Sequence, residues 1–174
     1  LVRCRHQLVK KRTRCKNQIK ALLSFYGLNP PGQGASRWSR QYVEALHQLP
    51  FEHPSGRQSL DLMLQELDFL SQQITEATRQ IRDLSKQERY RDNVRLLRTI
   101  PGISMLSAMV ILTELIDVNR FKDQDHLASY AGLTPGESSS GEKRTITGLT
   151  HRRNPFLRVL LIECSWIAAR KDPA

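Results

Sequence analysis

The sequence predicts an all-α protein in which a long helical hairpin is followed by a small helical domain. Two observations lead to this expectation. Apolar residues recur at steps of three and four over most of the chain, which is the period of an amphipathic helix. Glycine and proline gather in short segments between the periodic stretches, where they end one helix before the next begins. We expect the hairpin to occupy residues 1–92 and the helical domain to occupy residues 93–174.

The first periodic stretch covers residues 1–26 and predicts a helix that ends near Gly27. Its apolar stripe consists of Leu1, Cys4, Leu8, Cys15, Ile19, Leu22 and Leu23. Residues 27–58 then contain two segments rich in Gly and Pro, with a short helix between them that begins after Ser39, a suitable N-cap.

A second long helix begins near Ser59 and shows a heptad pattern. Its apolar positions are Leu60, Met63, Leu67, Leu70, Ile74, Ala77, Ile81 and Leu84. This spacing is typical of a coiled coil with a left-handed supercoil. The partner is either residues 1–26, folded back antiparallel, or the same helix of a second protomer, and we expect a homo-oligomer. The alternative is an ordinary core-facing helix of one globule.

Residues 93–116 predict two helices joined by a tight turn at Pro101 and Gly102. This turn resembles the hairpin of a helix-hairpin-helix element, with Ile100 and Ile103 packed under it and the second helix beginning by Ser104. The free N–H groups at the start of that helix could hold a phosphate oxygen without reading base identity. Gly102 and Ser104 are therefore candidate phosphate contacts, and an ordinary helical hairpin is the alternative.

Two further helices are expected in the C-terminal half. One is capped at Asp123 or Asp125 and ends at Gly132, and the last begins after Asn154, with Pro155 in its first turn. Between them, the serine-rich stretch 135–144 reads as a loop and residues 145–150 as a short strand pair.

The charge of the chain predicts a polyanionic partner. Lys and Arg number 27 against 17 Asp and Glu, which gives a formal net charge of +10. Each phosphate that a cation neutralises releases condensed counterions, so nucleic acid is the expected ligand. Residues 1–20 and 143–158 contain no acidic residue. The candidate phosphate contacts in these runs are Lys10, Lys11, Arg12, Arg14, Lys143, Arg144, Arg152, Arg153 and Arg158.

Other classes of site are not supported. The cysteines Cys4, Cys15 and Cys164 form no metal-ligand spacing, so we expect reduced thiols at small apolar positions and no metal site in this chain. The basic N-terminus is not followed by an apolar core, and the apolar run 103–116 is too short to cross a bilayer. We therefore expect a cytoplasmic protein without a membrane partner.

The serine triplet in residues 135–144 has two readings. Ser and Gly are ordinary turn formers, so a plain loop is the simpler reading from residue chemistry alone. A serine nucleophile would need cations to stabilise a phosphoryl transition state, and Arg144 and Arg158 are among those that follow within one loop and helix. Gly141, directly after Ser140, would let the backbone approach a phosphate closely.

Four motifs in one order resemble a known family. They are "LLRTIPGISMLSAMVILTEL", "RFKDQDHLASYAGLTP", "SSGEKR" and "NPFLRVLLIECSWIA". In that order they resemble the C-terminal transposase domain of bacterial insertion-sequence serine transposases, which carry an N-terminal RNase-H-like DEDD nuclease domain. Residues 1–23 resemble the helix that follows the nuclease domain. The chain is thus interpreted as part of a longer protein, and some members of the family are recombinases guided by a bridge RNA.

The resemblance implies roles for individual residues. The serine before the glycine, Ser140, would be the nucleophile that attacks a DNA phosphodiester, with Ser139 as the alternative and Ser138 also close. Strand exchange of this kind needs no nucleotide cofactor. Mg²⁺ would be bound by the nuclease domain, so this chain by itself is expected to bind DNA, and guide RNA where one is used, without turnover. The alternative function is a non-catalytic helix-hairpin-helix nucleic-acid-binding or dimerisation module.

Overall fold

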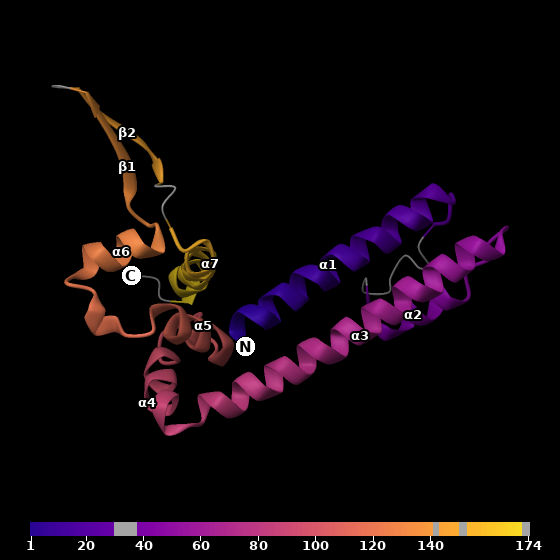
Figure 1. Cartoon of the computed structure of the whole chain (residues 1–174), viewed down its shortest axis with the longest axis horizontal. Helices are drawn as coiled ribbons and strands as arrows, with labels where there is room; N and C mark the ends of the chain where they lie inside the picture. The colour runs from indigo at the N-terminus through magenta and orange to yellow at the C-terminus, as the bar shows by residue number, and fades with distance from the viewer. Residues whose placement is uncertain (30–37, 141–142, 150–152, 172–174) are drawn as a thin grey trace. The chain divides into compact units, whose positions relative to one another are not determined.

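The computed structural model describes residues 1–29, 38–140, 143–149 and 153–171. Within them the chain forms two compact units, Leu1–Arg79 and Gln80–Ala174. The predicted all-α class is confirmed, because every element is a helix except for one two-stranded hairpin (Figure 1). The boundary expected between residues 92 and 93 stays a prediction.

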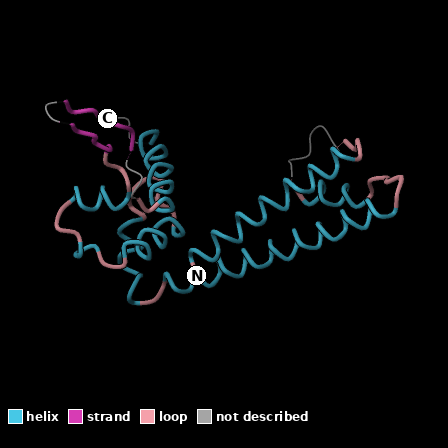
Figure 2. Tube along the Cα trace, turned by 45° about the horizontal axis from the view of Figure 1, so that its top comes forward, coloured by secondary structure: helices cyan, strands magenta, loops and turns pink. Residues whose placement is uncertain are grey.

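The first unit is built on an antiparallel pair of long helices, α1 (Val2–Phe25) and α3 (Pro54–Ser85). Figures 1 and 2 show the two helices side by side. Two hydrogen bonds fix their direction: Arg5 Nε donates to Thr78 Oγ1 over 2.8 Å, and Cys15 Sγ donates to the carbonyl oxygen of Met63 over 3.4 Å. Helix α3, which carries the heptad pattern, therefore packs against α1 of the same chain, which was one of the two expected partners. The supercoiled packing of a coiled coil stays a prediction.

The core of this unit follows the predicted seam with one change. Leu60, Leu67 and Leu70 are buried as expected, while Leu64 is buried and Met63 only partly so. The opposite side of this core consists of Cys15, Ile19 and Leu23 of α1, with Tyr42 and Leu46 of α2 (Arg40–His47). Cys4, expected in the apolar stripe, is exposed. At this end of α1 the buried residue is Val2.

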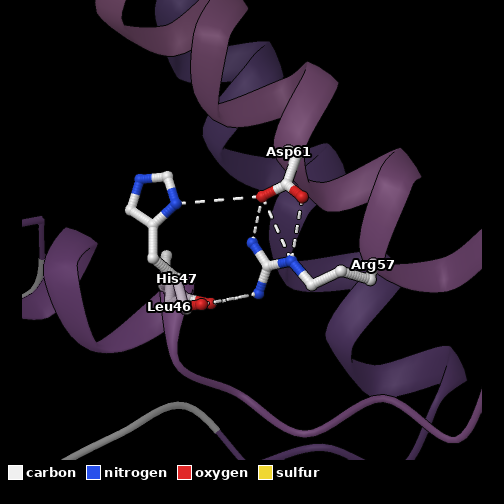
Figure 3. A network of polar contacts seen from close by, with 4 residues as sticks. All are labelled: Leu46, His47, Arg57 and Asp61. Carbon is white, nitrogen blue, oxygen red and sulfur yellow. Dashed lines mark hydrogen bonds and ion pairs between the residues drawn. The ribbon is translucent and has the colours of Figure 1, made fainter. Parts of the chain in front are cut away.

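The C-terminal end of α2 is held against α3 by one arginine. Arg57 Nη1 donates to the carbonyl oxygens of Leu46 and His47 over 3.0 and 3.1 Å, which satisfies two acceptors that a helix end leaves free (Figure 3). Asp61, one turn further along α3, accepts from the same guanidinium at Nε and Nη2. Ser39 caps the other end of α2, as predicted, by accepting from the N–H of Tyr42.

The second unit consists of shorter helices. After the last residues of α3 come α4 (Glu88–Leu97), α5 (Met105–Leu115), the 3₁₀ turn η1 (Val118–Arg120) and α6 (Gln124–Ala131). The strands β1 (Pro135–Ser140) and β2 (Lys143–Leu149) follow, and α7 (Pro155–Lys171) comes last. Helix α5 contacts both α4 and α7, and Ile111, Ala131 and Leu157 form a buried cluster among α5, α6 and α7.

Most helix boundaries in this unit agree with the prediction. Asp123 caps α6, Gly132 ends it in the left-handed conformation, and Asn154 Oδ1 accepts from the N–H of Leu157 to cap α7. One expectation about packing was wrong, because Ile100 is 47% exposed and does not pack under the turn.

Candidate functional site

The serine stretch Pro135–Ser140 forms a strand, so the expectation of a loop was wrong for these residues. Strand β1 pairs antiparallel with β2, and residues 145–149, where a strand pair was expected, are instead part of the single strand β2. The β-branched run Thr145–Thr147 favours extended backbone, which explains why β2 forms and gives the serines a partner. Between the two strands lie Gly141 and Glu142, outside the described residues, as is Arg152.

The register of the hairpin brings the serines opposite two cationic residues. Ser139 pairs with Arg144 and Ser140 with Lys143, the last pair before the strands end. Partners in an antiparallel pair have Cα atoms about 4.5–5.5 Å apart. The fold thus brings together, at backbone level, the candidate nucleophiles and two candidate phosphate contacts, at the end of the hairpin farthest from the helices (Figure 1).

The base of the hairpin is closed by hydrogen bonds between the helices that flank it. The backbone N–H of Asn154 donates to the carbonyl oxygen of Tyr130 over 3.0 Å, which joins the start of α7 to the end of α6. The Tyr130 hydroxyl in turn donates to the carbonyl oxygen of Glu114, near the end of α5, over 3.1 Å. Three helices therefore meet where the chain enters and leaves the two strands.

A buried carboxylate lies at this junction. Glu114 is 5% exposed, and its Oε2 accepts a 2.6 Å hydrogen bond from Asn154 Nδ2. Asn154 thus serves twice, since its side-chain oxygen caps α7 while its amide nitrogen binds the carboxylate. This pair was not predicted from the sequence. A signal existed, because Glu114 is the one acidic residue in the apolar stretch 103–116.

Close packing at Gly132 fixes the path of the chain beside the junction. Gly132 has a φ of +75°, and a Cβ added to it would lie 2.3 Å from Cβ of Arg153. The absence of a side chain therefore lets the backbone of the two segments approach. Arg153, a predicted phosphate contact, is exposed at the base of the hairpin, and Arg158 lies one turn into α7.

The turn between α4 and α5 faces α7. Gly102 has a φ of +88°, and an added Cβ would lie 2.5 Å from the carbonyl oxygen of Cys164. Ser104 caps α5, and its Oγ accepts from the N–H of Ser107 over 3.1 Å. The tight turn and the start of α5 are thus where the sequence predicts them, while phosphate binding by Gly102 and Ser104 stays a prediction.

The basic residues of α1 belong to the other unit. Lys10, Lys11 and Arg14 are exposed, and Arg12 is partly buried beside Lys16. Lys16 Nζ lies 5.0 Å from the centre of the Trp38 ring, a cation–π distance. Burial lowers the pKa of Lys16, and the charges of Arg12 and Lys20 lower it further. The α1 cations repel one another in this way and would gain from a polyanion alongside.

The chain offers no metal site of its own in the part that the structure describes. No group of three or more His, Cys, Asp or Glu side chains lies at metal-binding spacing there. All three cysteines are free. None of the described helices is both long and apolar enough to span a membrane.

Part of the chain is similar to a known protein family. Residues 94–174 match the family described as "Transposase IS116/IS110/IS902 family", and this range includes the serine hairpin and the Glu114–Asn154 junction. The chain is 30% identical over 165 residues to the transposase for insertion sequence element IS1328 of Yersinia enterocolitica, covering 95% of this chain and 48% of that protein.

A second similar protein is also named a transposase. The transposase for insertion sequence element IS1111A of Coxiella burnetii is 28% identical over 167 residues, covering 93% of this chain and 44% of that protein. The chain therefore spans less than half the length of these two relatives. Over residues 94–174 it is similar to the transposase domain of the IS116/IS110/IS902 family.

Proposed function

We propose that this chain is part of a DNA transposase, in which it binds DNA and supplies a serine nucleophile for strand cleavage and exchange. The observation that carries the proposal is the match of residues 94–174 to a transposase family, because the matched range includes the serine hairpin. A hairpin whose last residue pairs join serines to cations suits phosphoryl transfer, which needs a nucleophile and positive charge together.

Ser140 is the proposed nucleophile, and Ser139 is the alternative. The cross-strand partner of each is a cation, Lys143 for Ser140 and Arg144 for Ser139, so the backbone register supports both. Ser140 is favoured because Gly141 follows it, and a glycine lets the chain approach a phosphate closely. Arg152, Arg153 and Arg158 are proposed to hold neighbouring phosphates of the same strand.

The proposed chemistry is a pair of transesterifications. The Ser140 hydroxyl oxygen forms a bond to the phosphorus of a DNA phosphodiester, and the bond from that phosphorus to one strand oxygen breaks. The serine gives up its proton and the departing strand oxygen takes one, so charge and bond number are conserved. Attack by the hydroxyl of another strand end on the phosphoserine then releases the serine and joins the new strands. No nucleotide cofactor is consumed.

Part of the active centre is proposed to lie outside this chain. The resemblance to serine transposases implies an RNase-H-like DEDD domain, whose carboxylates would bind Mg²⁺. A metal ion there would supply Lewis-acid chemistry to the phosphate. The residues of this chain do not fit such a site in the described part, since no cluster of candidate ligands is present. The role proposed for the chain itself is to hold the serine and the surrounding cations.

Two further properties belong to the proposal. The α1 cations Lys10, Lys11, Arg12 and Arg14 would contact nucleic acid, either DNA or a structured guide RNA, through backbone phosphates. The long helices of the first unit would also contribute to a homo-oligomer, as the heptad pattern suggests.

The test uses the whole transposase, with its nuclease domain, and a suicide DNA substrate in the presence of Mg²⁺. Products are separated under denaturing conditions and digested for mass spectrometry. We expect a nucleotide adduct on Ser140, because the phosphoserine is trapped when the strand end diffuses away. Ser140→Ala should remove the adduct and strand transfer while leaving DNA binding within about twofold.

Matched variants identify the residue. Ser138→Ala and Ser139→Ala change the same strand, and each should leave the adduct in place if Ser140 is the nucleophile. An adduct that disappears only with Ser139→Ala would move the role to that residue. Wild-type DNA binding without any adduct, and strand exchange that survives all three substitutions, would instead support a non-catalytic nucleic-acid-binding module.

A further inference from the structure

We propose that a cavity beside α4 binds a phosphodiester group of a nucleic-acid backbone. The cavity has a volume of about 460 Å³, within the range of ligand sites, and shares no residue with the serine hairpin. It lies in the Gln80–Ala174 unit, between the end of α3, one face of α4 and the start of α5. The inference rests on the proposed function, because it assigns a second nucleic-acid contact to the same domain.

All charged residues that line the cavity are cationic. Four of its lining residues are cations and none is acidic; the cations are Lys86, Arg91, Arg95 and Arg98. Arg91 and Arg95 lie in α4 and Arg98 is its C-cap, so steps of four and three place the three arginines on one face of the helix. Arginine presents a planar fork of donors that matches two oxygens of one phosphate.

Acidic neighbours compensate only half of these cations. Lys86 Nζ lies 3.4 Å from Asp83 Oδ1, and Arg91 Nε lies 3.3 Å from Asp92 Oδ1. Both pairs are exposed, and pairs of this kind contribute little. Within the residues that the structure describes, Arg95 and Arg98 make no ion pair. The C-terminal end of α4 carries about half a negative charge, which attracts them but does not balance four cations.

The remaining walls strengthen this field. Val94, 5% exposed, and Met105 are apolar, and a low-dielectric wall concentrates the field of nearby charges. The hydroxyl groups in the lining are already engaged as donors: Ser85 Oγ donates to the carbonyl oxygen of Arg82 and Thr99 Oγ1 to that of Leu96. The cations are therefore the donors available to a ligand, which favours a phosphate over a neutral polar group.

The test measures binding of the 174-residue chain to a labelled DNA duplex of about 30 base pairs and, separately, to RNA of the same sequence. Fluorescence anisotropy gives the Kd between about 50 and 200 mM salt. The double variant Arg95→Gln/Arg98→Gln removes the two cations without acidic partners. Arg89→Gln/Arg170→Gln is the matched control, since it removes two exposed cations of the same unit that do not line the cavity.

We expect the cavity variant to weaken binding about 10- to 100-fold and to lower the salt slope by about one, since a lost phosphate contact lowers it by roughly 0.9 on duplex DNA. The control should change Kd by less than about threefold. A loss of affinity for DNA alone, or for RNA alone, supports the site and identifies the nucleic acid that it binds. Equal losses by the two double variants, or a wild-type chain that binds neither nucleic acid, would overturn the proposal.

A charge-conserving variant guards against loss through misfolding. Arg95→Lys/Arg98→Lys keeps the charge but removes the planar fork, so it should bind with a Kd between those of wild type and the glutamine variant. Full wild-type affinity of the glutamine variant would exclude the site. The outcome is independent of the serine test. A missing Ser140 adduct would not change these Kd values. Unchanged Kd values in the cavity variant would not affect the adduct.

Discussion

The α1–α3 hairpin and the Gln80–Ala174 unit hold their helices together with different side chains. In the hairpin, the fully buried residues Ile19, Leu23 and Leu60 are aliphatic and follow a regular seam. In the second unit, a smaller apolar cluster lies beside the buried pair of Glu114 and Asn154. Apolar packing tolerates exchanges that conserve side-chain volume, whereas a buried hydrogen bond requires one geometry. The directional contacts lie at the base of the serine hairpin, where a fixed geometry is useful.

The largest loss of stability is expected from a substitution in the apolar seam. Ile19→Ala should lower the free energy of unfolding of the Leu1–Arg79 unit by about 2–5 kcal/mol, because Ile19 is 0% exposed and its loss leaves a cavity. Hydrogen exchange followed by mass spectrometry measures each unit separately. Leu62→Ala, on the solvent face of α3 at 66% exposed, is the control and should cost less than about 0.5 kcal/mol. Equal costs would contradict the packing described for α1 and α3.

A somewhat smaller effect is expected at the buried polar pair. Asn154→Ala should lower the free energy of unfolding of the second unit by about 3 kcal/mol. About 1 kcal/mol comes from the lost cap of α7, and the rest from the lost hydrogen bond to the Glu114 carboxylate. Hydrogen exchange should show the loss first in amides at the start of α7 and the end of α6.

Asn154→Ser separates the two contributions. Serine can still cap α7 but cannot reach Glu114 with an amide, so it should recover about 1 kcal/mol of the loss. If serine restored full stability, the hydrogen bond to Glu114 would contribute nothing, and the contrast between the two units would disappear.

The sequence predicted those parts of the fold that depend on local signals. The seam of α3, the caps Ser39, Asp123 and Asn154, and the left-handed Gly132 were all read from spacing and residue type, because each involves residues only a few positions apart. Helix periodicity could not distinguish Met63 from Leu64 as the buried residue, since both positions lie near the same face.

Features that depend on distant residues were missed. The serine strand exists because residues 143–149 pair with it, and its own Ser and Gly content is typical of a turn. The Glu114–Asn154 pair joins positions 40 residues apart, which no local pattern reports. The candidate site was found through motifs of a family and not through geometry. The cationic face of α4 had a local signal, the spacing of Arg91, Arg95 and Arg98, but its cavity also needs Met105 from α5.

The smallest expected effect is on the pH dependence of the stability of each unit. The hydrogen bond from Arg57 lowers the pKa of Asp61 below its usual 3.8, with the charges of Arg57 and His47 acting in the same direction (Figure 3). A hydrogen bond from His126 likewise lowers the pKa of Asp123 in the second unit. A carboxylate whose pKa is lower in the folded state stabilises the fold above its unfolded pKa. That contribution is lost as the pH falls through the folded value.

Asp61→Asn should therefore flatten the pH dependence of the Leu1–Arg79 unit below about pH 4 and leave that of the second unit unchanged. Asp123→Asn, which keeps a side-chain oxygen for the cap of α6, should do the reverse. Exchange rates of each unit, measured from pH 5 downward and corrected for intrinsic exchange, give the two curves. Because both carboxylates are exposed, each change should be small, and an Asp61→Asn curve parallel to wild type would show that Arg57 holds α2 through Leu46 and His47 without help from Asp61.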